Sequence, residues 1–211
     1  HELAEVLAGV RKADAGKILL AGRDITHSAS LDRWRMGVGY VPAERGEVGS
    51  IGDFSLVDNV TMNYYFDDRY VRGGLIDQAR MRRLTEQLIA EYSVVTPNPD
   101  VKAKNLSGGN LQKLILARVM SRNPRLLIVN LPTQGLDVGA TEFVRTKLME
   151  AKKAGAGILL VSEDLEEVLA LSDRVAPMYE GEFMGIIPGA QAEREVVGGM
   201  MAGLRIEDVQ P

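Results

Sequence analysis

The stretch that decides the fold runs from residue 105 to residue 137. It opens with Asn105-Leu-Ser-Gly-Gly-Asn-Leu-Gln-Lys113, continues through the strand-like Leu126-Leu-Ile-Val129, and closes with Gly135-Leu-Asp137. A Ser-Gly-Gly turn that opens a helix presents free backbone N–H groups and a hydroxyl at the positive end of the helix dipole, with no Cβ to obstruct an anion. Serine before a helix is also a common N-cap, and three residues alone favour that interpretation. The residues on either side of this turn are needed to choose between an anion site and a simple N-cap.

Outward from this stretch, helical and strand-like segments alternate along the chain. The strand-like runs are apolar without alternation, which is typical of a parallel sheet covered by helices on both faces. The sequence therefore predicts an α/β fold with a parallel core. We expect strands at 17–25, 38–42, 126–131, 157–162, 174–179 and, weakly, 182–187. We expect helices at 2–9, 31–36, 58–65, 75–92, 105–122, 140–154, 165–171 and in the tail from 189.

Composition excludes several classes of protein. The 211 residues are 45% hydrophobic and carry 25 Lys+Arg against 29 Asp+Glu, so disorder and a broad nucleic-acid-binding surface are both disfavoured. The absence of cysteine excludes a disulfide scaffold and a thiolate metal site. No apolar run approaches the ~18–20 residues that a membrane span requires. A globular domain that does not cross a bilayer is the class that remains.

In their order along the chain, these motifs resemble the ATPase subunits of ABC transporters, in which an LSGGQ signature helix precedes a Walker B strand, a Pro-Thr step and a Leu-Asp loop. Three details resemble more narrowly the importers of simple sugars and nucleosides, whose ATPase subunit fuses two nucleotide-binding domains. They are Asn110 in place of the signature glutamine, the run Gly135-Leu-Asp-Val-Gly-Ala140, and the loop Gly39-Tyr-Val-Pro-Ala-Glu-Arg45. That loop resembles one in the second domain of such tandem proteins.

The resemblance implies a P-loop NTPase-like (RecA-like) parallel core with an ABC-type helical subdomain. We expect one nucleotide-binding domain over 1–211, with its core at 1–54 and 107–188, the helical subdomain at about 55–106 and a tail at 189–211. The phosphate loop G-x-x-x-x-G-K-[ST] is absent from these residues, because Ile18 follows Gly16-Lys17 and Arg11 stands at the place of the first glycine. The resemblance places that loop and the first strand upstream of His1.

Four positions that serve hydrolysis in the family differ here. Asn130 replaces the carboxylate that holds Mg²⁺ through water, and Leu131 replaces the glutamate that orients the attacking water. Glu163 stands where the switch histidine is expected, and Ala43 stands at the Q-loop position. An amide is a weaker ligand for a hard cation, and leucine cannot position a proton. We therefore predict no catalytic residue and no metal ligand in this chain, which alone should be inactive.

The chain retains the signature motif, the part of the nucleotide site that contacts ATP held by a partner domain. In the family, two domains face each other head to tail, and each ATP lies between the phosphate loop of one and the signature of the other. The resemblance implies that Ser107, Gly108, Gly109 and Gln112 contact ATP held by the partner domain, which also supplies the Mg²⁺ site. It implies that Asp137 organises the domain interface.

The sequence thus predicts the C-terminal, degenerate half of a tandem ATPase that energises uptake of a simple sugar or nucleoside. Its expected partners are the N-terminal nucleotide-binding domain of the same polypeptide and, indirectly, a substrate-binding protein, with no nucleic acid. Transmembrane permease subunits are also expected, with a coupling helix that docks in the groove formed by the helical subdomain and the loop 46–54. Its expected location is the cytoplasmic face of the membrane, as a peripheral protein. Two alternatives stay open: a structural dimerisation domain without a nucleotide role, and a soluble ABC ATPase outside transport.

Overall fold

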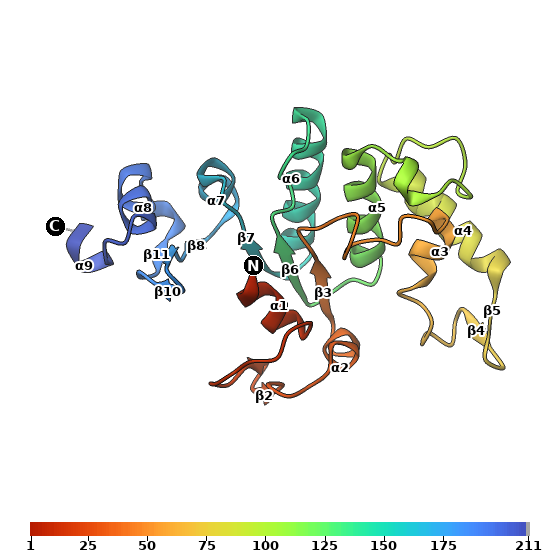
Figure 1. Ribbon diagram of the computed structural model, residues 1–211, viewed down its shortest axis with the longest axis horizontal. Coiled ribbons are helices and arrows are strands. Elements are labelled where there is room, and N and C mark those ends of the chain that lie inside the picture. Colours follow the sequence, from red (N-terminus) through yellow and green to blue (C-terminus); the bar gives the residue numbers. More distant parts are fainter. Residues whose placement is uncertain (210–211) are drawn as a thin grey trace. The chain divides into compact units, whose positions relative to one another are not determined.

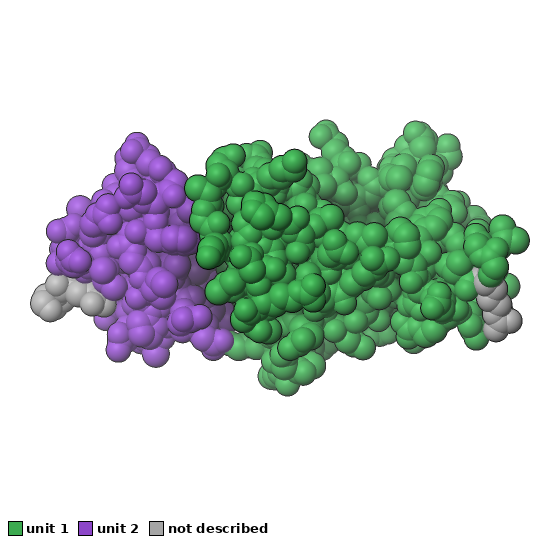
Figure 2. All heavy atoms as spheres, turned by 90° about the horizontal axis from the view of Figure 1, so that it is seen from below, with its two compact units in different colours: residues 1–161 green, residues 162–211 purple. Residues whose placement is uncertain are grey.

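A computed structural model describes residues 1–209, apart from the side chains of Arg72 and Val209. The chain divides into two compact units, residues 1–161 and the residues from 162 onward, which Figure 2 shows in different colours. This division differs from the subdomains expected from the sequence, whose boundaries at 55–106, 107–188 and 189–211 stay a prediction. The last two residues of the expected tail lie outside the described residues.

The first unit is built around a parallel sheet with the strand order β3 (Val38–Val41), β6 (Leu126–Asn130) and β7 (Gly157–Val161) (Figure 1). Tyr40 pairs in register with Ile128, so corresponding residues of neighbouring strands share a face. Because the strands are parallel, the loops that follow β3 and β6 emerge at the same edge of the sheet. The predicted α/β fold with a parallel core is confirmed.

Helix α1 (Glu2–Ala8) covers one face of this sheet. Its buried Ala4 and Ala8 pack in one cluster with Val38 and Ile128. Short side chains on the helix allow its backbone to come close to the strands, and the apolar strand residues exclude water from the contact. This packing explains why a strongly apolar strand such as β6 is stable in the interior.

The opposite face carries α5 (Gly108–Met120) and α6 (Val138–Lys153), which lie side by side in Figure 1. Helix α5 packs directly against β3 at Gly39. A Cβ at that glycine would lie 2.8 Å from Cγ1 of Val119, closer than ordinary contacts permit. The glycine therefore sets how closely α5 approaches the sheet.

A buried arginine fastens the C-terminal end of α1 to the segment that follows it. Arg33, on α2 (Ser30–Arg35), is only 2% exposed. Its guanidinium donates to the carbonyls of Val6 and Leu7, at 2.6 and 2.9 Å, and to two carbonyls of the preceding loop. A positive charge at a helix C-terminus is favourable, and these acceptors compensate for the desolvation that lowers the pKa of Arg33.

The single strand expected over 17–25 is wrong, because the segment forms a hairpin. β1 (Leu19–Leu20) pairs antiparallel with β2 (Arg23–Asp24). Between them, Ala21 and Gly22 both have positive φ angles, of 49° and 80°. Two successive left-handed residues form the tight turn that suits the twist of a hairpin. Ala21 is not one of the residue types that favour such a turn, so the sequence did not indicate it.

Capping residues explain why two helices begin later than the sequence predicts. Helix α5 was expected from residue 105 but begins after its N-cap Ser107, and a short 3-10 turn, η1 (Ala103–Asn105), precedes it. Helix α4 (Gln78–Glu91) was expected from residue 75 but begins after Asp77, whose carboxylate accepts a hydrogen bond from the Arg80 N–H.

The residues just before α4 form a small hairpin, β4 (Val71–Arg72) with β5 (Leu75–Ile76). Helix α3 (Leu56–Thr61) also differs from the expected 58–65, since Ser55 caps it and it begins two residues earlier than expected. A side chain that satisfies free N–H groups outweighs the apolar pattern in setting a helix start.

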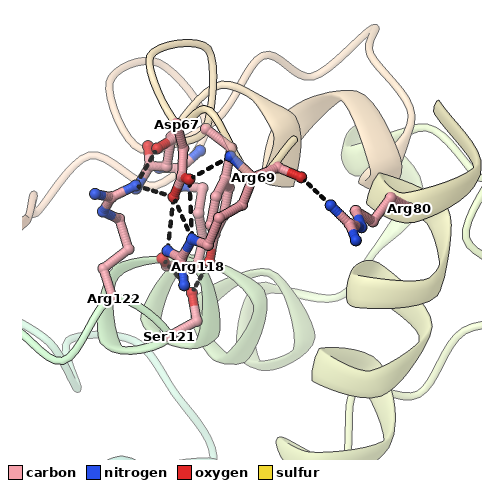
Figure 3. Close-up of polar contacts among 8 residues, drawn as sticks. Asp67, Arg69, Arg80, Arg118, Ser121 and Arg122 are labelled. Atoms are coloured by element: carbon pink, nitrogen blue, oxygen red, sulfur yellow. Dashed lines mark hydrogen bonds and ion pairs between the residues drawn. The ribbon is translucent and has the colours of Figure 1, made fainter. Parts of the chain in front are cut away.

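A group of arginines ties the segment between α3 and α4 to the end of α5 (Figure 3). The Asp67 side chain is 9% exposed, and its carboxylate accepts two strong hydrogen bonds from Arg69. The Nη1 of Arg122, two residues after the end of α5, lies 3.4 Å from Asp67 Oδ2. Hydrogen bonding from Arg69 lowers the pKa of Asp67. Arg122 also stacks on Trp34, 3.7 Å from the ring centroid to its guanidinium carbon. The charge and the aromatic face together fix this corner of the unit.

The second unit has its own apolar core, formed by Val175, Met184, Ile187, Val197 and Met200. Helix α7 (Leu165–Leu171) begins where predicted, capped by Asp164. The strand expected over 174–179 is wrong as a single element, because Pro177 interrupts it. The remaining elements are β8 (Arg174–Val175), β9 (Met178–Tyr179), β10 (Glu182–Phe183), β11 (Ile187–Pro188), η2 (Gly189–Gln191), α8 (Arg194–Met201) and α9 (Ile206–Val209).

Within the described part of the chain, no helix combines the length and the apolar character that a membrane crossing requires.

Candidate functional site

The candidate site lies where the parallel strands β3 and β6 end. The loop after Val41, the first turn of α5 and the loop after Asn130 meet there, because the register pairs Val41 with Val129. Ligands of α/β proteins bind at the carboxyl ends of parallel strands. The topology therefore places most of the residues singled out in the sequence near one edge of the first unit.

Ser107 and Asn110 form the first turn of α5. The Ser107 hydroxyl accepts hydrogen bonds from the Asn110 N–H and from its side-chain Nδ2, the latter at 3.0 Å. Asn110 Oδ1 in turn accepts from the Val95 N–H at 2.9 Å, which ties the turn to the segment after α4. Ser107 is thus an N-cap, and its exposed position at the positive end of a 13-residue helix also suits an anion. Its contact with ATP stays a prediction.

The two glycines of this turn differ in their surroundings. A Cβ at Gly109 would lie 3.0 Å from Cβ of Ala140, so Gly109 allows α5 and α6 to pack closely. A Cβ at Gly108 would meet only Nη1 of Arg45, at an ordinary 3.9 Å. Gly108 is the exposed position of the pair. The sequence alone did not separate the packing glycine from the open one.

Gln112 lies in the interior, away from the exposed turn. Its side chain is fully buried, and its Oε1 accepts a hydrogen bond from Arg45 Nε at 2.9 Å. Its Nε2 has no hydrogen-bond partner among the described residues. The structure therefore does not present Gln112 on the surface that carries Ser107 and Gly108.

Arg45 is a residue of this site whose role the sequence analysis did not identify. Besides Gln112, its guanidinium donates to the backbone carbonyl of Gln134, in the loop after β6. Desolvation by burial lowers the pKa of Arg45. Arg45 is the last residue of the loop Gly39–Arg45, but its partners come from distant segments, so no local pattern indicates the contact.

At the end of β6 the side chains are buried and uncharged. Asn130 is 1% exposed, and its Oδ1 has no hydrogen-bond partner in the described residues. Leu131 is buried with a left-handed φ of 45°, and its N–H donates to the Val161 carbonyl at 2.8 Å. A neutral amide and an alkyl group do not fit a Mg²⁺ ion, which prefers carboxylates and water. No cluster of three potential metal ligands occurs among the described residues.

The three other positions singled out in the sequence, Ala43, Asp137 and Glu163, lie in three different parts of the chain. Ala43 is half-buried in the loop after β3, and Asp137 is the exposed N-cap of α6, where its Oδ1 accepts from the Ala140 N–H at 2.8 Å. Glu163 is exposed and belongs to the second unit, just before Asp164 caps α7. Nothing in these contacts assigns a chemical role to Ala43 or Glu163.

The loop after β3 is fastened along one side of α5. Arg118 donates to the carbonyls of Gly49 and Asn59, at 2.6 and 3.2 Å, and burial lowers its pKa to about 10. A Cβ at Gly49 would lie 2.7 Å from Cδ1 of Ile115, so the loop touches the helix directly. These contacts hold the loop against α5.

A cleft opens at the other end of α5, also within the first unit. It is lined by the end of α1, the start of β3 and the side chains of Trp34, Asn63 and Arg122. The loop 46–54, where the sequence predicts docking of a membrane subunit, contributes no residue to the lining. No local sequence pattern predicts this cleft, because its walls come from five separate elements.

Comparison with known proteins relates this geometry to one family. The family described as "ABC transporter" matches residues 2–134. A glucose import ATP-binding protein of Haloferax volcanii is 43% identical over 96% of the chain, and a guanosine import ATP-binding protein of Bacillus subtilis is 40% identical over 96%. A ribose import ATP-binding protein of Halalkalibacterium halodurans is 36% identical over 93%. The chain spans only 37%, 40% and 39% of the length of these three relatives.

Solved structures agree on the fold. A dimeric ATP-binding cassette in a post-hydrolysis state with ADP and phosphate has a TM-score of 0.74 at 17% identity, over 89% of this chain and 79% of that one. An ATP-binding cassette of an ABC transporter in its ADP conformation has a TM-score of 0.70 at 18% identity, over 99% and 81%. At these identities the likeness concerns the fold alone, and it matches the P-loop NTPase-like architecture predicted from the sequence.

Proposed function

This chain belongs to the ABC transporter family, and from that premise we propose that it is the C-terminal nucleotide-binding domain of a tandem import ATPase. The relatives support this proposal, since they are import ATP-binding proteins of which the chain spans less than half. Their printed substrates are glucose, guanosine and ribose. We propose a simple sugar or nucleoside as the imported substrate.

The observation that carries the proposal is the exposed turn at the start of α5. Ser107 and Gly108 are exposed there, and the following N–H groups lie at the positive end of the helix. In the proposal this turn contacts the terminal phosphate of ATP bound to the N-terminal domain of the same polypeptide. Gly109 allows the turn to pack on α6, and Asp137, exposed at the start of α6, faces the same interface.

Gln112 has a different place in the proposal from the one its motif implies. Because it is fully buried and bonded to Arg45, it supports the turn from its interior side and does not contact the phosphate. The N-terminal domain, not this one, supplies the residues for Mg²⁺, since Asn130 and Leu131 do not fit the ion. ATP hydrolysis in the complete protein then takes place at the partner domain's site, and this chain alone is inactive.

Transmembrane permease subunits complete the proposed assembly. The chain would act at the cytoplasmic face of the membrane as a peripheral subunit, and a substrate-binding protein would deliver the substrate from the other side. The cleft lined by Trp34, Asn63 and Arg122 and the neighbouring loop 46–54 are the proposed docking region. Deleting residues 49–54 should uncouple transport from this domain, and intact transport and membrane assembly would refute the docking assignment.

The test of the proposed function is steady-state ATP hydrolysis by the full-length protein assembled with its permease, comparing wild type with Ser107→Arg. An arginine there would fill the space that the partner's phosphate needs, so we expect turnover to fall at least about a hundredfold. Asp77→Arg is the matched control, because it places arginine at the N-cap of another helix, α4. Unchanged turnover in Ser107→Arg would favour the structural dimerisation domain instead.

A further inference from the structure

We propose that Arg45 is a positioning residue that holds the phosphate-facing turn Ser107–Gly109 in place by bridging three segments; this inference rests on the proposed function. The segments are the loop after β3, the helix α5 and the loop after β6. They are distant in sequence, and the parallel register of β3 and β6 brings them to one edge of the sheet. One side chain contacts all of them.

The geometry of the guanidinium supports a bridge. Its Nε donates to Gln112 Oε1 at 2.9 Å, and its Nη2 donates to the carbonyl of Gln134. Its Nη1 lies beside Gly108, 3.9 Å from the position that a Cβ would take there. Arginine presents several N–H donors in a fixed plane, so it can satisfy separate acceptors at once, which the single ammonium of lysine cannot do in the same way.

Burial makes the contact with Gln112 important. The Gln112 amide is fully buried, and its Nε2 already has no partner among the described residues. Without Arg45, its Oε1 would lose its hydrogen bond as well. A buried amide left without partners is costly, so the first turns of α5 and the loop after β3 depend on the same bond.

The loop that carries Arg45 is itself held on α5. The Ser50 hydroxyl donates to the Arg45 carbonyl at 2.8 Å, and Arg118 holds the Gly49 carbonyl at 2.6 Å. Gln112, Ile115 and Arg118 lie on one side of the helix, so the loop contacts α5 at successive turns. Of these three contacts, Arg45 with Gln112 is nearest the phosphate-facing turn, and Arg45 also reaches the loop that leads to Asp137.

This arrangement predicts an effect on turnover with little effect on ATP affinity. In the proposed assembly ATP binds first to the partner domain, and the turn Ser107–Gly109 engages it when the two domains close. Arg45 acts on the geometry of that closed state. Losing it should therefore lower kcat and leave KM for ATP nearly unchanged, since small misplacements of positioning groups reduce turnover strongly.

The experiment measures kcat and KM for ATP in the full-length protein assembled with its permease, for Arg45→Met, Arg45→Lys and Arg205→Met. We expect both Arg45 variants to lower kcat about tenfold or more, with KM within about twofold. Arg205→Met is the matched control, because it also removes an arginine bonded to another residue, here the exposed pair with Glu182 at 2.8 Å, in the second unit. Its kcat should stay within about twofold of wild type.

A double-mutant cycle tests the bridge directly, and it remains informative if one of the single variants folds poorly. Gln112→Leu should lower kcat on its own, and combining it with Arg45→Lys should add little further loss, since both remove the same contact. Additive losses would overturn the bridge. So would full activity in Arg45→Lys, because then positive charge alone would suffice.

Ser107→Arg, measured in the same assay, separates the two proposals. If Ser107→Arg keeps full turnover, the proposed function fails. If Ser107→Arg abolishes turnover while Arg45→Met retains it, the proposed function stands and only the role of Arg45 is refuted.

Discussion

The start of α5 and the end of β6 belong to the same edge of the first unit, yet their side chains are arranged in opposite ways. At the start of α5, Ser107 is exposed and its hydroxyl is bonded within the turn. At the end of β6, Asn130 is buried with an unpartnered oxygen, and Leu131 has a left-handed backbone. One region presents polar groups outward, and the other is closed and uncharged.

In the proposed function, this difference means that one edge of the sheet keeps the groups that act on the partner domain while the residues at the end of β6 cannot serve a reaction centre of its own. The helix dipole and the exposed N–H groups at α5 do not depend on the side chains at 130 and 131. The left-handed φ at Leu131 costs about 1–2 kcal/mol for a residue other than glycine. Backbone strain of this kind is commonly found at functional sites, and here it persists at a position without a reactive side chain.

After Ser107→Arg, the largest expected effect comes from introducing a charge at the end of β6. Asn130→Asp would place a carboxylate at a position only 1% exposed, where burial raises its pKa above the ordinary value of about 3.9. The penalty is absent at a pH below that value and grows as the pH rises above it, because the unfolded chain then ionises more readily. We expect a loss of about 2–4 kcal/mol in unfolding free energy at pH 7.

Urea unfolding of this variant at pH 4.5 and pH 7.5 measures the effect. Asn123→Asp is the matched control, because Asn123 is exposed, and it should change stability by less than about 0.5 kcal/mol. Equal stability of Asn130→Asp at both pH values would mean that the end of β6 still accommodates a charge, which would break the comparison.

A smaller effect should separate the two glycines of the open region. Gly109→Ala forces a Cβ to within 3.0 Å of Ala140 and should cost about 1–2 kcal/mol in unfolding free energy, whereas Gly108→Ala meets only an ordinary contact. Alanine has the higher helix propensity, so Gly108→Ala should be neutral or stabilising by up to about 1 kcal/mol. Thermal unfolding of the two variants makes the comparison, and equal losses would contradict the assignment of Gly109 as the packing position.

The smallest net effect is expected at Leu131. Leu131→Gly loses buried apolar area but relieves the left-handed backbone, so the two contributions largely offset each other. Leu127→Gly, at a fully buried position of β6 without positive φ, loses area with no relief. We expect the Leu131 variant to be more stable than the Leu127 variant by about 2 kcal/mol in chemical denaturation. Equal losses would show that the left-handed backbone carries no strain.

Elements with long apolar runs were predicted well, and elements that depend on single residues were not. The strands β6 and β7 lie within one residue of their predicted ends, because burial on both faces requires continuous apolar sequence. The hairpin at Ala21 and the interruption at Pro177 were missed, since each depends on a local backbone conformation that overrides the pattern. Capping by Ser107 and Asp77 likewise shifted helix starts by a few residues.

For the candidate site, the sequence by itself determined which chemical groups are present and which are missing. The amide at Asn130, the alkyl group at Leu131 and the Ser-Gly-Gly turn are properties of single residues or of adjacent ones, so they can be recognised without a fold. Only the tertiary structure decided that Gln112 is buried, that Gly109 is the packing glycine and that Arg45 joins three segments. Those facts depend on the parallel register of β3 and β6, which brings distant segments to one edge, and no local pattern encodes that contact.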